Sequence, residues 1–247
     1  MGSRLSEICK KLKVCDLEQF IPEVEFNEPK QYLTDIMELA LKERRNRRIA
    51  RLIKRAGFPV PKTLEGYDFS PITFPEGFQQ SDLLSLDFIV RKENILMIGA
   101  VGTGKTRLSI ALGVKACMAG YEVKFYRTAD LVNELVEKQR LGTIDKFMKA
   151  IMKCNVIVID EVGYVPISKQ GSELLFSVIS KCYENLSIIV TSNLEFGSWN
   201  SIFGDARLTT ALVDRLIHHC HILNFQGKSY RFQQAIKRKN AMTEGSK

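Results

Sequence analysis

The eight residues 99–106, GAVGTGKT, fit the phosphate-binding pattern G-x-x-x-x-G-K-[ST] and decide the fold of this chain. The apolar run NILMI at 94–98 predicts a short buried strand before the loop, and apolar residues at three-to-four spacing over 106–114 predict a helix after it. Glycines let the backbone curl until consecutive N–H groups face one anion, and the start of the helix adds partial positive charge. A glycine turn beside a surface lysine is the alternative, but the order strand, loop, helix favours a nucleotide site.

In such a site we expect Lys105 to reach the β- and γ-phosphates and Thr106 to place its hydroxyl on Mg²⁺. The loop and the first residues of the helix form the predicted nucleotide-binding set, which is Gly99, Ala100, Val101, Gly102, Thr103, Gly104, Lys105, Thr106 and Arg107.

Polar residues follow two further apolar runs. The run VIVI at 156–159 ends in Asp160 and Glu161, and the run at 187–190 is followed by TSN at 191–193. Ligands of open α/β sheets bind at the carboxyl ends of the strands, so these residues are expected to face the same crevice as the phosphate loop. Asp160 is then the carboxylate on the Mg²⁺ side, and Glu161 orients and polarises an attacking water. Asn193 can hydrogen-bond that water or the γ-phosphate, or it can equally be a turn or cap residue.

The composition is that of a globular protein of 247 residues, with 45% hydrophobic and 26% charged residues. No apolar run approaches 18 residues and the N-terminus is charged, so we expect neither a secretory signal nor a membrane span, and a cytoplasmic location. The six cysteines form no C-x-x-C pair, and HHCH at 218–221 has no second ligand cluster elsewhere in the sequence. Reduced thiols are therefore expected, and a metal centre of His and Cys ligands is not.

The net charge of +8 is concentrated in one segment. Residues 42–55 carry eight basic side chains against Glu43 alone, a net of +7 in fourteen positions. Most of the excess charge therefore lies in one stretch of helical length.

The chain is predicted to be helical over its first sixty residues and to alternate strand and helix after about residue 88. Pro29 suits the first turn of a long helix that Gly57 ends, and residues 58–80, with four prolines, suggest an extended connector. Five strands are expected, at 95–98, 122–126, 156–160, 187–191 and 222–225. This pattern predicts an α/β fold with a five-stranded parallel sheet between helices, after a small all-helical N-terminal domain. The expected divisions are 1–60, helical and basic; 61–80, the linker that approaches the nucleotide; 81–232, the nucleotide-binding domain; and 233–247, a basic tail expected to be disordered.

Phosphoryl transfer needs positive charge near the transferred group, which arginine often supplies. The downstream candidates are Arg207, Arg215 and Arg231. Arg215 lies in ALVDRL at 211–216, a predicted helix with the Asp-Arg pair at the edge of its apolar face, where a local ion pair is the alternative.

With these residues in place, the chain resembles the AAA+ ATPases of the initiator and helicase-loader branch, and most closely the IstB family of insertion-sequence helper ATPases. The resemblance runs from Lys62 to Arg231. Beyond the phosphate loop it rests on KTLEGYDF at 62–69, TADL at 128–131, IDEVGYVP at 159–166, TSN at 191–193, FGD at 203–205 and DRLIHHCHILNFQGKSYR at 214–231.

The resemblance implies a role for each matched position. Asp160 and Glu161 match the Walker B pair, Asn193 matches sensor 1, and Arg231 matches sensor 2. Arg215 matches the arginine finger, which in this family reaches into the neighbouring subunit's site. The residues after 231 are too few for a helical lid, so an AAA+ core without a C-terminal lid domain is implied. Family members often carry prolines where this loop has Ala100 and Val101, which leaves the spacing intact.

The resemblance also implies the cofactors ATP and Mg²⁺ and three kinds of partner: further copies of the chain, double-stranded DNA and an IstA-like transposase. It assigns the basic segment to duplex phosphates, and the absence of interleaved aromatics there disfavours stacking on single-stranded bases. A solvated helix face or a dock for an acidic partner are the alternatives. The implied DNA-binding residues are Lys42, Arg44, Arg45, Arg47, Arg48, Arg51, Lys54 and Arg55.

Two other functions use the same core. A replicative helicase loader similar to DnaC shares Arg215 and Arg231, and a small-molecule phosphotransferase shares the phosphate loop. The stretch 218–231 favours the transposition helper over the loader, and a carboxylate after Asp160 suits activation of water rather than of another acceptor.

Overall fold

The structure, a computed structural model, describes residues 4–14, 17–26, 28–227 and 229. By their contacts the residues divide into two compact units, 1–51 and 52–247, with the boundary inside one long helix. The division expected from the sequence at residue 60 places the whole helix in the first unit. The contacts instead assign the end of the helix, including Leu52 and Ala56, to the core of the second unit.

Helices make up the regular structure of the first unit. These are α1 (Arg4–Lys11), α2 (Leu17–Phe20), a 3₁₀ turn (Ile21–Glu23) and α3 (Pro29–Ala56), whose last turn belongs to the second unit. Pro29 suits the first turn of α3 because its missing N–H has no intrahelical partner there. The helix ends before Gly57, whose φ of +81° is a left-handed conformation that glycine adopts without steric cost. The predicted long helix and its stop signal are confirmed.

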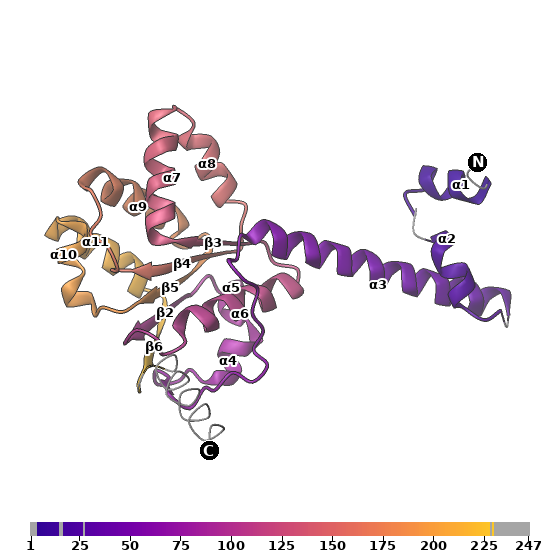
Figure 1. The fold of residues 1–247 in the computed structure, drawn as a ribbon, viewed down its shortest axis with the longest axis horizontal. Helices are drawn as coiled ribbons and strands as arrows, with labels where there is room; N and C mark the ends of the chain where they lie inside the picture. Colours follow the sequence, from indigo (N-terminus) through magenta and orange to yellow (C-terminus); the bar gives the residue numbers. More distant parts are fainter. Residues whose placement is uncertain (1–3, 15–16, 27, 228, 230–247) are drawn as a thin grey trace, which may run out of the picture. The chain divides into compact units, whose positions relative to one another are not determined.

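A six-stranded sheet with the order β1-β6-β2-β5-β4-β3 forms the centre of the second unit (Figure 1). Its strands are β1 (Ile72–Thr73), β2 (Asn94–Gly99), β3 (Val123–Arg127), β4 (Val156–Val162), β5 (Ser187–Ser192) and β6 (Cys220–Phe225). Strands β2 to β6 pair in parallel, as predicted, whereas β1 pairs antiparallel with β6. The expected count of five strands is wrong because residues 72–73 of the connector join the edge, and two residues are too few to show a strand pattern.

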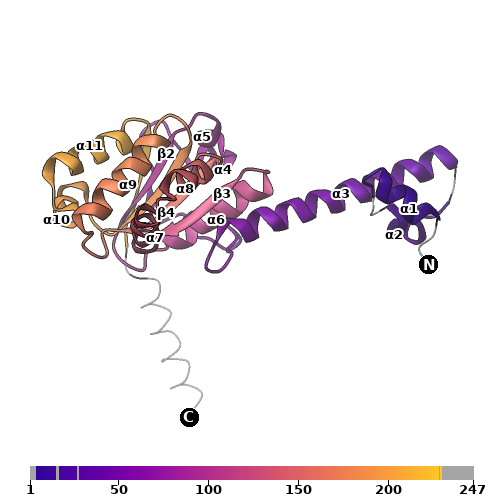
Figure 2. The same cartoon turned by 90° about the horizontal axis from the view of Figure 1, so that it is seen from above.

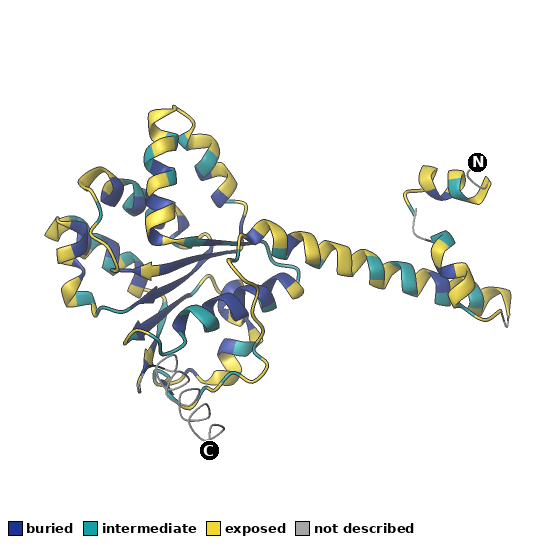
Figure 3. Ribbon diagram, in the orientation of Figure 1, coloured by how far each residue is buried: buried dark blue, intermediate teal, exposed yellow. Residues whose placement is uncertain are grey.

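Helices cover both faces of this sheet (Figures 1 and 2). One face holds α4 (Gln80–Ser85), α5 (Asp87–Val90) and α6 (Lys105–Met118). The other holds α7 (Thr128–Arg140), α8 (Ile144–Ile151), α9 (Lys169–Cys182), a 3₁₀ turn (Phe196–Ser198), α10 (Asn200–Phe203) and α11 (Ala206–Ile217). Successive strand residues supply opposite cores: Ile95 packs with the first set of helices and Leu96 with the second. The strands are accordingly buried along most of their length (Figure 3).

The strand order fixes which polar ends meet. Strand β5 lies between β2, which leads into the phosphate loop, and β4, which carries Asp160 and Glu161. No helical domain follows β6 within the described residues. In that same part of the chain, no helix has the length and apolar character needed to cross a membrane.

Candidate nucleotide site

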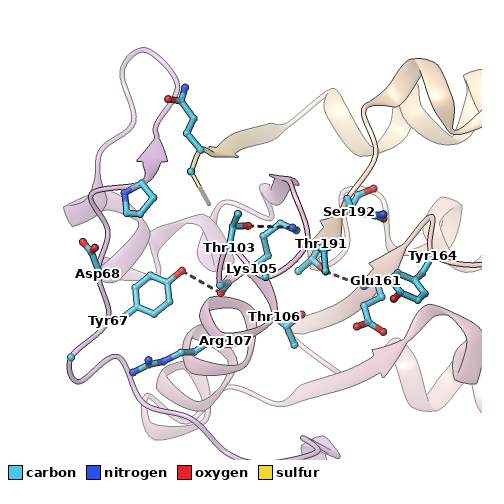
Figure 4. A pocket seen from close by; sticks show the side chains of 18 residues that line it. Tyr67, Asp68, Thr103, Lys105, Thr106, Arg107, Glu161, Tyr164, Thr191 and Ser192 are labelled. Atoms are coloured by element: carbon cyan, nitrogen blue, oxygen red, sulfur yellow. Dashed lines mark hydrogen bonds between the residues drawn. The ribbon is translucent and has the colours of Figure 1, made fainter. Parts of the chain in front are cut away.

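A cavity of about 580 Å³ opens at the carboxyl edge of the sheet (Figure 4). Its lining includes residues 101–107 of the phosphate loop and α6, Glu161 at the end of β4, and residues 191–193 at the end of β5. Residues 66–68 and Pro71 of the connector, Tyr164 after β4 and residues 226–227 after β6 also line it. The structure therefore brings the predicted loop, acid and amide to one edge of the sheet.

Lys105 is held inside the curve of the loop and is 8% exposed. Its Nζ donates to the carbonyl oxygen of Gly99 at 2.6 Å and to that of Ala100 at 2.7 Å. Gly104, with a φ of +101°, turns the chain into α6, so the first N–H groups of the helix and the Lys105 ammonium face the same space. Oxygens of a polyphosphate fit this arrangement, because they can replace the two carbonyls as charge-assisted acceptors.

Asp160 is 1% exposed and lies behind the loop. Its Oδ1 accepts a hydrogen bond from Thr106 Oγ1 at 3.0 Å and another from Thr191 Oγ1 at 2.6 Å. Its Oδ2 is buried and has no hydrogen-bond partner among the described residues. Burial raises the pKa of Asp160, and the hydrogen bonds from the two threonines oppose that rise. A buried, unpartnered carboxylate oxygen beside a threonine hydroxyl fits Mg²⁺, bound directly or through water.

Glu161 stands exposed to the cavity, while its backbone adopts a left-handed φ of +61°. The regular pairing of β4 with β5 is interrupted between Ile159 and Val162. The backbone N–H of Glu161 donates to the side chain of Thr191 at 2.9 Å instead (Figure 4). The sequence did not single out Thr191, although it is the first residue of the TSN stretch.

Asn193 lines the cavity and its Oδ1 is buried without a hydrogen-bond partner among the described residues. The turn after β5 is capped by the neighbouring residue, because Ser192 Oγ accepts from the N–H of Leu194 at 3.1 Å and donates to the Val162 carbonyl at 2.8 Å. The cap interpretation of Asn193 therefore has no support in the described contacts, and its amide remains available to a ligand.

The connector reaches the phosphate loop through a tyrosine that the sequence reasoning also missed. Tyr67 donates from its hydroxyl to the carbonyl of Gly104 at 3.2 Å. The guanidinium of Arg107 lies 5.6 Å from the centre of the Tyr67 ring and donates to the carbonyl of Glu65 at 3.0 Å. Arg107 lines the cavity as predicted, but its described partners belong to the connector. The stretch KTLEGYDF was a usable signal for this contact.

Arg215 lies away from this cavity. It is in the last turn of α11, which leads into the start of β6, whereas the phosphate loop follows the end of the neighbouring, parallel strand β2. Its guanidinium carbon is 4.8 Å from the centre of the Phe176 ring, and its Nη1 donates to the Ala211 carbonyl at 2.9 Å. The structure thus places Arg215 at the opposite edge of the sheet from the phosphate loop of the same chain.

Arg231 lies outside the described residues. The nearby Ser229 is described, and a Cβ added to Gly102 would collide with its side chain. Ser229 therefore lies against Gly102 of the phosphate loop.

The eight basic residues of 42–55 all lie on α3 and all are exposed. Arg47 pairs with Glu43 at 2.8 Å and Arg55 with Glu122 at 3.6 Å, both at the surface. Neither pair buries its arginine, so both guanidinium groups stay accessible to a further anion.

His218 and His219 meet an acid that the sequence did not indicate. Ligand atoms of Glu184, His218 and His219 all lie within 4.8 Å of one another, and Tyr183 hydrogen-bonds His218 at 2.8 Å. The sequence shows no second ligand cluster for HHCH, and the turn between α9 and β5 brings the single carboxylate of Glu184 to its histidines. All three side chains are exposed, so water competes for each ligand atom.

A family model and individual relatives match most of this chain. The model of the IstB-like ATP binding protein family matches residues 24–238. The ATP-binding protein of insertion sequence IS5376 from Geobacillus stearothermophilus is 40% identical over 204 residues, which cover 83% of this chain and 81% of that protein. The ATP-binding protein of insertion sequence IS21 from Pseudomonas aeruginosa is 39% identical over 188 residues, which cover 75% and 70%.

Solved structures share the fold. AMPPCP-bound DnaA from Aquifex aeolicus has a TM-score of 0.55 at 22% identity, over 74% of this chain and 57% of that one. The DnaC helicase loader has a TM-score of 0.51 at 22% identity, over 66% of this chain and 96% of that one. With the family model matched over 24–238 and two such relatives, the chain belongs to the IstB-like ATP-binding proteins of insertion sequences, with the fold of the AAA+ ATPases.

Proposed function

We propose that this chain is an ATP-hydrolysing helper of transposition, which assembles on duplex target DNA, selects or remodels the site and stimulates a partner transposase. One observation carries the proposal: a member of the IstB-like family combines a cavity fit for Mg²⁺ and ATP with a helix of eight exposed cations. The first feature suits hydrolysis and the second suits a polyanion.

The residues at the carboxyl edge have the chemistry of hydrolysis. Lys105 holds phosphate oxygens, and Thr106 with Asp160 holds Mg²⁺, which when bound neutralises charge on the β- and γ-phosphates. Glu161 projects into the cavity as an acceptor that orients water, and Asn193 offers an amide to that water or to the γ-phosphate. In this proposal water receives the phosphoryl group, whereas in a small-molecule phosphotransferase another substrate receives it.

Assembly completes the site, because Arg215 lies at the opposite edge of the sheet from the loop of its own subunit. A head-to-tail contact between copies brings one subunit's Arg215 to the next subunit's γ-phosphate. Stacking on Phe176 at 4.8 Å and the bond to Ala211 keep the guanidinium oriented before that contact. Arg231 is proposed to contact nucleotide within its own subunit.

DNA contact is assigned to α3. Its cations displace condensed counterions from phosphates and carry little sequence information, which suits a target of nearly arbitrary sequence. Residues Lys42, Arg44, Arg45, Arg47, Arg48, Arg51, Lys54 and Arg55 are the proposed contacts.

The test measures ATP turnover with and without duplex DNA, single-stranded DNA and the cognate transposase, in wild type and in Glu161→Gln. We expect duplex DNA to stimulate wild-type turnover, and Glu161→Gln to lose on the order of 100-fold in turnover while retaining an ATP-stabilised oligomer on DNA. Glu195→Gln, an exposed acid outside the cavity lining, is the matched control and should behave as wild type. Turnover indifferent to DNA, or failure of Glu161→Gln to trap an assembly, would reject the proposal.

The same assay separates the helper from a helicase loader. Capture of the transposase, with stimulation by duplex DNA, supports the helper. Capture of a replicative helicase, with stimulation by single-stranded DNA, would overturn it in favour of the loader.

A further inference from the structure

Thr191 occupies a special place in the pairing of β4 with β5. Ile159 pairs with Val190 and Val162 pairs with Ser192, so Asp160 and Glu161 together face Thr191 alone. This is a β-bulge, in which two residues of one strand oppose one residue of the other. The bulge contains both acids of the proposed catalytic pair.

The bulge interrupts the backbone hydrogen bonds between β4 and β5, and the hydroxyl of Thr191 supplies hydrogen bonds in their place. It accepts the backbone N–H of Glu161 at 2.9 Å and donates its own hydrogen to Asp160 Oδ1 at 2.6 Å. A hydroxyl has one hydrogen to donate, and here that hydrogen is committed to the carboxylate. The side chain is 1% exposed, and its own strand pairs with β2 at Met97, so its position is fixed.

These two bonds act on different atoms of the proposed reaction. The bond to the Glu161 N–H holds a residue whose left-handed φ of +61° is unfavourable for a side chain with a Cβ. The bond to Asp160 Oδ1, shared with Thr106, leaves Oδ2 as the oxygen without a partner among the described residues. One hydroxyl thus holds the backbone of Glu161 and occupies one oxygen of Asp160, so that Oδ2 is the oxygen that would be left for a metal ion.

We propose that Thr191 is a positioning residue for hydrolysis: through the bulge, its hydroxyl holds the backbone of Glu161 and the carboxylate of Asp160 in the orientations that the reaction needs. The inference rests on the proposed ATP hydrolysis. It assigns no contact between Thr191 and the nucleotide itself.

The test compares Thr191→Val, which keeps the branched shape and removes the hydroxyl, with Thr191→Ser, which restores it. We expect Thr191→Val to lower kcat by about 10- to 100-fold with a nearly unchanged KM for ATP, because misplaced catalytic groups slow the chemical step more than binding. Thr191→Ser should recover most of kcat. Ser187→Ala removes another buried hydroxyl from the same strand, one that donates to Phe88 at 3.0 Å far from the cavity, and should leave kcat unchanged.

A second readout needs neither ATP nor metal. In the nucleotide-free protein, NMR-detected exchange of the Glu161 amide should be about 10-fold or more faster in Thr191→Val than in wild type, and near wild type in Thr191→Ser. Unchanged Glu161 exchange in Thr191→Val, or a kcat for Thr191→Ser as low as for Thr191→Val, would overturn the inference. If wild type itself hydrolyses no ATP, the proposed function fails, and the amide measurement still decides whether Thr191 holds the bulge.

Discussion

The carboxyl edge of the sheet and helix α3 both present groups suited to phosphate, but they do so in opposite ways. At the sheet edge, Lys105 and Asp160 are buried and fixed by hydrogen bonds of 2.6 to 3.0 Å. On α3, the eight cations are exposed, and the ion pair of Arg47 with Glu43 is open to solvent. Burial and fixed geometry suit a reaction at one phosphorus atom, whereas exposure and number suit a long polyanion.

The difference predicts two kinds of mutational response. A buried, hydrogen-bonded group cannot be replaced by its neighbours, so single changes at the sheet edge should have large effects. Exposed cations along a helix each release a similar number of counterions, so changes on α3 should have small effects that add.

The largest effect is expected for Lys105→Ala. Removing the ammonium takes away the charge inside the loop, so ATP affinity and turnover should each fall by about 100-fold or more. Isothermal titration with ATP and a phosphate-release assay measure the two quantities. Lys115→Ala removes a lysine nearer the other end of the same helix, outside the cavity lining, and should match wild type. If Lys105→Ala lowered ATP affinity and turnover only a few-fold, the sheet edge would respond to mutation as α3 is expected to, and the contrast between the two regions would be lost.

Arg215→Ala sharpens the comparison, because this arginine is fixed like the sheet edge yet lies outside the cavity. Turnover should fall by about 100-fold while ATP affinity stays near that of wild type, since the guanidinium acts from a neighbouring subunit in the transition state. Arg140→Ala, an exposed arginine in the last turn of α7 and outside the cavity lining, is the control and should match wild type.

Mixing Arg215→Ala with Lys105→Ala tests the arrangement between subunits. In a head-to-tail assembly of equal amounts of the two variants, about a quarter of the interfaces combine an intact loop with an intact Arg215. Turnover should therefore rise toward about a quarter of the wild-type value. No recovery, under conditions where mixed assemblies form, would contradict action in trans.

The sequence predicted the sheet edge well because its signals are local. Glycines of the phosphate loop, apolar strands and the acids that end β4 can each be recognised within a few residues, and parallel strands bring their ends to one edge. The two-residue strand β1 was missed because residues 72–73 are too short for a period, and their pairing with β6 is set by tertiary contacts.

Residues whose role depends on a distant partner were the ones missed. Thr191 matters because β5 lies between β2 and β4 and because a bulge makes it face both acids, and neither fact is visible in the order of residues along the chain. Glu184 reaches His218 and His219 only through the turn before β5. The stacking of Arg215 on Phe176 likewise joins two helices that no local pattern connects.

Changes on α3 should produce an intermediate and additive effect. Replacing Arg44 and Arg48 together with alanine should weaken duplex binding several-fold and reduce the slope of log affinity against log salt by about 1 to 2, because each lost phosphate contact contributes about 0.9. Further pairs should add similar steps. Lys146→Ala with Lys149→Ala removes two exposed cations of α8 and should leave the slope unchanged. A single α3 substitution that abolished binding would indicate a specific contact and break the contrast with the sheet edge.

The smallest effect is expected where the connector meets the phosphate loop. Tyr67→Phe removes the 3.2 Å hydrogen bond to the Gly104 carbonyl and keeps the ring under Arg107, so KM for ATP should rise only about two- to fivefold with kcat preserved. Arg107→Ala loses both the ring contact and the bond to Glu65, so its KM for ATP should be higher than that of Tyr67→Phe by a small factor. Tyr121→Phe, away from the cavity lining, supplies the control. If Tyr67→Phe instead lowered kcat to the level of Lys105→Ala, the connector would belong with the fixed groups of the sheet edge. The hydrogen bond from Tyr67 to the loop would then matter as much for turnover as the Lys105 ammonium.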